Sequence, residues 1–102
     1  MAHDHLYQPA PCSSWPVEPL RAVGSSYRAA RGEGQQGEAS VAQAMVAYIA
    51  AGGSEAAARE TVLAMLASLS VEHGDWLWGP AQEWLERHPS AAEDADLLSD
   101  AP

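Results

Sequence analysis

The chain has 102 residues and a net charge of −9, and its five cationic side chains other than histidine are all arginines. A chain of this length forms one domain at most, and without phenylalanine its core must draw on four tryptophans, three tyrosines and the aliphatic residues. The acidic balance argues against nucleic acid and anionic membranes as direct partners, since both require a basic surface.

Three sequence features favour a soluble, cytoplasmic protein. The longest mostly apolar run, residues 41–51, is too short to span a bilayer. The N-terminus lacks the basic and apolar regions of a signal peptide. Cys12 is the only cysteine and cannot form an internal disulfide. Abundant alanine, with arginine in place of lysine, indicates a bacterial source.

Residues 1–18 are predicted to form an extended, proline-rich arm. Pro9, Pro11 and Pro16 fall within it, and a segment this rich in proline does not sustain a helix. Two alternatives stay open: the arm is disordered, or its apolar side chains hold it against another surface. The side chains available for such contacts are Leu6, Tyr7, Trp15 and Val17.

A helical domain is predicted from residue 19 to residue 98. Its first helix begins at Glu18-Pro19, because proline suits the first helical position. Gly24 weakens this helix, although the apolar residues Leu20, Val23, Tyr27 and Ala30 recur on one face. Residues 31–38 contain three glycines and are predicted to form a flexible loop.

The next two helices are predicted to form a central antiparallel helical hairpin. Ser40 can cap the first helix, and Gly52-Gly53 can end it. Ser54 is expected to begin the second helix, in which Glu55 and Arg59 are spaced for an ion pair. Because only about three residues join these helices, they should lie antiparallel.

Residues 75–88 have helical spacing, but Pro80 argues against one continuous helix. Proline has no N–H and clashes with the preceding turn, at a cost of about 3 kcal/mol in a helix interior. We therefore expect a helix that begins at Pro80, with Gly79 as its cap and residues 75–78 as a tight turn.

The end of the chain completes an all-α prediction. Ser90 can cap a last short helix that reaches Leu98, and residues 99–102 form an acidic tail. No segment has the alternation typical of a strand. The predicted fold is a small bundle of about four short helices with a proline-rich N-terminal arm.

The histidines and Cys12 are the candidates for metal binding or catalysis. His3-Asp4-His5 can chelate a divalent ion, but a stable site needs three or four ligands, and no second cluster with ligand spacing follows. Cys12 has neither a glycine-rich turn nor evident oxyanion donors beside it. His73 and His88 each close a predicted helix, where a cation is favoured. We therefore expect no enzyme activity, no metal and no cofactor.

The tryptophans have two open interpretations, packing within the small domain or contact with a partner. Trp84 lies on a clear apolar stripe and is predicted to be in the core. Trp76 and Trp78 are two residues apart on the predicted turn, and at least one is expected to be exposed or to lie under the arm. Tryptophan is enriched at the energetic centres of protein interfaces.

The charges are unevenly distributed along the chain. Residues 20–31 carry three arginines and no acid, whereas residues 32–102 carry twelve acids and two arginines. The arginines either pair with the acidic body of the same molecule or are free to meet an acidic patch on another protein.

These features predict a non-catalytic interaction protein: a small acidic subunit, adaptor or inhibitor that forms a hetero-complex with a larger bacterial protein. A homo-oligomer stays open. The alternatives are an acidic DNA mimic that blocks a nucleic-acid-binding protein, and a small metal-binding protein that uses His3 and His5. The predicted partner-binding residues are Tyr7, Trp15, Arg21, Arg28, Arg31, Trp76 and Trp78.

Overall fold

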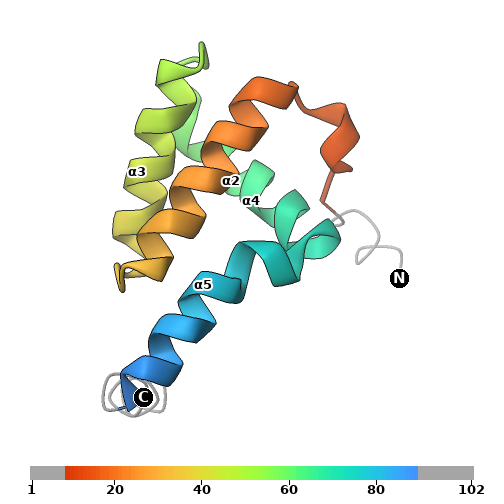
Figure 1. Cartoon of the computed structure of the whole chain (residues 1–102). Helices are drawn as coiled ribbons and strands as arrows, with labels where there is room; N and C mark the ends of the chain where they lie inside the picture. Colours follow the sequence, from red (N-terminus) through yellow and green to blue (C-terminus); the bar gives the residue numbers. More distant parts are fainter. Residues whose placement is uncertain (1–8, 90–102) are drawn as a thin grey trace, which may run out of the picture.

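The computed structural model describes residues 9–89, which form a short 3₁₀ turn and four α-helices (Figure 1). The elements are η1 (Cys12–Ser14), α2 (Val17–Gly32), α3 (Gly37–Ala50), α4 (Ala58–Glu72) and α5 (Gly74–Arg87). No strand occurs in this part of the chain, so the predicted all-α bundle is confirmed. None of these helices combines enough length and apolarity to cross a lipid bilayer. The predicted last helix, the acidic tail and Tyr7 lie outside the described residues.

The helices α2 and α3 lie side by side and run in opposite directions (Figure 1). The helix α2 begins at Val17 and includes Pro19 in its first turn, where a missing N–H leaves no helical hydrogen bond unmade. It ends in a Schellman arrangement: Gly34 has φ +88°, and the N–H of Gln35 donates to the carbonyl of Ala30 at 3.1 Å.

The flexible loop predicted for residues 31–38 is shorter than expected, because only residues 33–36 lie between α2 and α3. Gly32 continues α2 and Gly37 begins α3. At Gly32, a Cβ atom would lie 2.8 Å from the Cβ of Pro80. The absence of a side chain there permits a close approach between α2 and α5, which offsets the low helix propensity of glycine.

The predicted end of α3 is confirmed, but its start and the start of α4 differ from the expectation. Gly52 has φ +100° and the N–H of Gly53 donates to the carbonyl of Tyr48 at 2.9 Å, which closes α3. Ser40 is not a cap; it lies fully buried inside α3. Ser54 precedes a turn, and α4 begins only at Ala58 and packs on α3 as well as on α2.

The helix predicted to start at Pro80 is wrong, since α5 starts at Gly74 and contains Pro80 in its interior. The N–H that proline lacks would normally reach the carbonyl oxygen of Trp76, four residues earlier. That oxygen instead accepts a hydrogen bond from Nε of Arg28 on α2, at 2.8 Å. A donor from another helix thus satisfies the carbonyl that proline leaves free.

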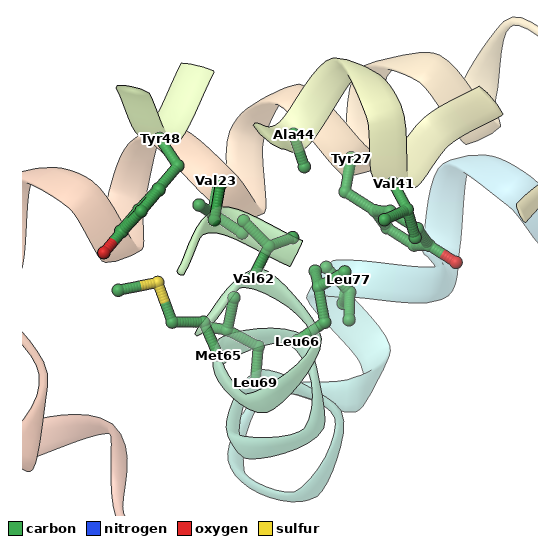
Figure 2. Packing of buried hydrophobic residues seen from close by; sticks show 11 residues of the cluster. Val23, Tyr27, Val41, Ala44, Tyr48, Val62, Met65, Leu66, Leu69 and Leu77 are labelled. Carbon is green, nitrogen blue, oxygen red and sulfur yellow. The ribbon is translucent and has the colours of Figure 1, made fainter. Parts of the chain in front are cut away.

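The core is formed where α2, α3, α4 and α5 meet, and its side chains point toward one another (Figure 2). Val23, Val62, Met65 and Leu77 are almost completely buried. The whole cluster comprises Val23, Tyr27, Val41, Ala44, Tyr48, Ala58, Val62, Met65, Leu66, Leu69 and Leu77.

The tryptophans border this core and do not fill it. Trp84, predicted to be in the core, is only half-buried; its ring stacks on His88 with centroids 4.1 Å apart. A Cβ atom on Gly34 would overlap the Trp84 ring, so the ring lies directly over the turn between α2 and α3. Aliphatic and tyrosine side chains therefore supply the interior, and the indole rings cover its edges.

Candidate functional site

The described part of the N-terminal arm, residues 9–16, is held against α4 by hydrogen bonds. Nε1 of Trp15 donates to Oγ of Ser68 at 3.0 Å, and the Ser68 hydroxyl in turn donates to the carbonyl of Ala10. The backbone N–H of Cys12 donates to Oε2 of Glu72 at 2.7 Å. Of the two alternatives for the arm, attachment to another surface therefore holds for this segment, and the surface belongs to the same chain.

This attachment creates a hollow of about 260 Å³ between the arm and the helices. We call it the Trp15–Trp76 groove. Its lining is mostly apolar, and the exposed side chain of Arg21 lies at it. The residues that form its walls are Trp15, Val17, Leu20, Arg21, Leu69 and Trp76, with Cys12, Ser13 and His73 beside them.

The wall formed by Trp76 is positioned by α2. Trp76 remains 41% exposed, but a Cβ atom on Gly24 would lie only 3.1 Å from its ring. The Arg28 guanidinium carbon lies 5.1 Å from the ring centroid, a cation–π distance. Gly24, which weakened the helix prediction, therefore provides the space in which the indole packs.

Trp78, the other member of the predicted tryptophan pair, does not line the groove. Its ring packs edge-to-face on Tyr27, with centroids 5.5 Å apart and an interplanar angle of 86°. It is partly buried and packs against the core cluster. The structure thus answers which of the pair is the more exposed: Trp76.

The three arginines of α2 have different surroundings. Arg21 lies at the groove and is exposed. Arg28 is engaged with Trp76. Arg31 lies at a second hollow of about 190 Å³ beside Trp84, where its Nη1 donates to the carbonyl of Gln35 at 3.2 Å. The predicted site residues Trp15, Arg21 and Trp76 are therefore brought together, and Arg31 and Trp78 are placed elsewhere.

Within residues 9–89, none of these three arginines forms an ion pair. The one ion pair in this part of the chain joins Arg59 to Glu38 at 2.8 Å. Arg59 was expected to pair with Glu55 on its own helix; its partner is instead on α3. The hydrogen bond and the charge of Arg59 lower the pKa of the Glu38 carboxyl. No described carboxylate therefore lies within ion-pair distance of the α2 arginines.

A second cluster adjoins the groove and was missed by sequence reasoning. Ligand atoms of Cys12, Glu72 and His73 all lie within 4.8 Å of one another. Burial and the neighbouring negative charge and hydrogen bond of Glu72 raise the pKa of the Cys12 thiol. The thiol is therefore protonated at neutral pH, which disfavours a nucleophilic role. The only local signal was the adjacency of two ligand-type residues, Glu72 and His73, because Cys12 lies 60 positions before Glu72.

Comparisons with models of protein families, with curated proteins and with solved structures gave no match.

Proposed function

We propose that this protein is a non-catalytic interaction module that binds a protein partner through the Trp15–Trp76 groove. The observation that carries the proposal is an apolar hollow whose aromatic walls are fixed by contacts within the chain. Ser68 accepts a hydrogen bond from the Trp15 indole. The Trp76 ring packs closely on Gly24 and lies under the Arg28 guanidinium. Walls that are already ordered lose little conformational entropy on binding, which favours affinity.

The occupant that fits this groove is a partner segment with one apolar anchor side chain and a carboxylate next to it. The hollow of about 260 Å³ is smaller than most pockets for small-molecule ligands. Arg21 supplies a positive charge at the groove, and α2 carries three arginines against one acid, Glu18. Since the chain as a whole has a net charge of −9, an acidic partner segment is attracted here and repelled by most of the remaining surface.

A crosslinking experiment in the source cells tests the proposal. A photo-reactive amino acid replaces Val17, which is 65% exposed beside the groove, and in a control replaces Val46, which is 69% exposed on α3. We expect one discrete protein adduct from position 17 and none from position 46. The adduct is identified by mass spectrometry, and the partner is then purified for binding measurements.

The binding measurements compare Val17→Asp and Arg21→Glu with the matched variant Val46→Asp. Asp at position 17 is compatible with folding because it lies in the first turn of α2. We expect each groove variant to raise the dissociation constant about tenfold or more, as for a central interface residue. Val46→Asp should leave the dissociation constant unchanged. Equal losses at both valines would contradict the proposal. Affinity that falls steeply with salt but is insensitive to Val17→Asp would favour the acidic DNA mimic.

The proposal also includes a bacterial, cytoplasmic hetero-complex in which this chain is the accessory subunit.

A further inference from the structure

We infer that Cys12, Glu72 and His73 form a binding site for one divalent transition-metal cation of the zinc type, with a fourth coordination position open to solvent. This site is distinct from the N-terminal His3 and His5 and does not depend on the proposed partner.

Two elements and the junction between α4 and α5 bring the ligands together. Cys12 is the first residue of η1, Glu72 is the last residue of α4, and His73 is the single residue that joins α4 to α5. The bond from the Cys12 N–H to Glu72, at 2.7 Å, fixes the backbone of η1 against the carboxylate. Cys12 is thus held next to Glu72 by a backbone hydrogen bond before any metal binds.

The spacing of the ligand atoms suits a small tetrahedral site. The Sγ of Cys12, a carboxylate oxygen of Glu72 and a ring nitrogen of His73 lie within 4.8 Å of one another. Bond lengths to zinc place such ligand atoms about 3.3–3.6 Å apart. Because the side chains of Glu72 and His73 are exposed, changes in their χ angles can shorten these separations without moving the helices.

The electrostatic surroundings favour a cation. The end of α4 and the start of α5 both lie at this corner, so their opposite partial charges largely offset each other and the side chains set the sign of the local charge. Glu72 adds a full negative charge, and Asp75 lies two residues beyond His73 along the lining of an adjoining hollow. When the metal binds, the S–H bond of Cys12 breaks, its proton passes to water, and the sulfur electron pair forms the metal–sulfur bond. Nothing is oxidised or reduced.

The ligand types indicate which metals suit the site. A thiolate and an imidazole select zinc, cobalt, nickel or copper over magnesium and calcium, which prefer oxygen ligands alone. His73 lines both the Trp15–Trp76 groove and the adjoining hollow that Glu72 and Asp75 also line, so ions and water can reach the cluster. A bound metal would fasten the arm to the junction of α4 and α5.

The test uses the full chain, freed of metal with a chelator and titrated with Co²⁺ as a spectroscopic stand-in for Zn²⁺. We expect one Co²⁺ per chain, with a sulfur-to-cobalt charge-transfer band that Zn²⁺ abolishes by displacement. Cys12→Ser should remove the band, and it should weaken Zn²⁺ binding by more than about 100-fold, the upper range for losing a residue that only supports a ligand. His73→Gln should weaken binding similarly while circular dichroism shows that the helices remain.

Two matched controls locate the metal. His88→Gln removes the other described histidine, and the double variant His3→Ala, His5→Ala removes the N-terminal pair; both should bind Zn²⁺ and Co²⁺ as the parent does. Absence of the charge-transfer band in the parent protein would overturn the inference. So would Zn²⁺ binding that survives Cys12→Ser but is lost when His3 and His5 are replaced.

Discussion

Replacement of Arg28 by methionine tests the explanation for a proline inside α5. Arg28 donates to the Trp76 carbonyl at 2.8 Å and lies over the Trp76 ring at 5.1 Å. A hydrogen bond from a charged donor contributes about 1.5–3 kcal/mol, and a cation–π contact at an exposed site contributes about 0.5–1 kcal/mol. Because Trp76 is 41% exposed, water can partly replace the lost donor, so we expect Arg28→Met to lower the free energy of unfolding by about 2 kcal/mol.

The decisive measurement is a double-mutant cycle with Pro80→Ala. Alanine at position 80 restores the N–H that α5 lacks, so the Trp76 carbonyl gains a donor from its own helix. The cost of Arg28→Met should then fall to about 1 kcal/mol, which gives a coupling energy of about 1 kcal/mol. Urea unfolding of the four proteins measures these values from the midpoints, provided that the denaturant slopes agree.

Arg21→Met is the matched control for this cycle. Arginine and methionine have similar helix propensities, and Arg21 is exposed on the same helix without a hydrogen bond to any residue from 9 to 89. Its replacement should change stability by less than about 0.5 kcal/mol. If Arg28→Met costs no more than this control, or costs the same whether position 80 is proline or alanine, the carbonyl of Trp76 does not depend on Arg28.

Two further predictions concern the arm and the surface ion pair. Ser68→Ala should lower the free energy of unfolding by about 1–3 kcal/mol, because it leaves the indole N–H of Trp15 without its acceptor; urea unfolding measures this, and an equal loss for the control Ser70→Ala would contradict it. Arg59→Gln should raise the pKa of Glu38, observed by NMR titration of its carboxyl. The folded pKa of Glu38 lies below the unfolded value, so the pair contributes to stability above the unfolded pKa and its contribution is lost as pH falls through the folded pKa. An unshifted titration in Arg59→Gln would refute the assigned cause.

Helix ends were predicted best where a glycine with positive φ follows the helix. Gly52 ends α3 as the sequence indicated, because a residue without Cβ adopts this conformation at little cost. Helix starts were predicted less well: Ser40 and Ser54 both resemble caps, yet neither caps a helix. A serine side chain serves equally in a cap, a turn or a buried hydrogen bond, so its identity alone does not decide among them.

The candidate site was predictable only in its parts. An aromatic surface that involves Trp15 and Trp76 follows from proline density and from the two-residue spacing of the tryptophan pair. The choice of Trp76 over Trp78 as the exposed ring depended on Gly24, which lies on another helix and lets the indole pack closely. The metal-ligand cluster could not be predicted, because residue types 60 positions apart are juxtaposed only by packing of the arm on α4.

The amino-acid sequence alone determined that this chain is helical, that α3 stops before Gly52-Gly53 and that its charge is strongly acidic, because these properties depend on neighbouring residues and on composition. Only the tertiary structure decided that Pro80 lies within a helix, that the tryptophans line the edges of the core, and that Cys12 meets Glu72 and His73. The physical reason is that a penalty imposed locally, such as a missing N–H, can be offset by a donor from a distant segment such as Arg28. Local preferences act over one or two helical turns, and they carry no information about which distant segment will supply that donor.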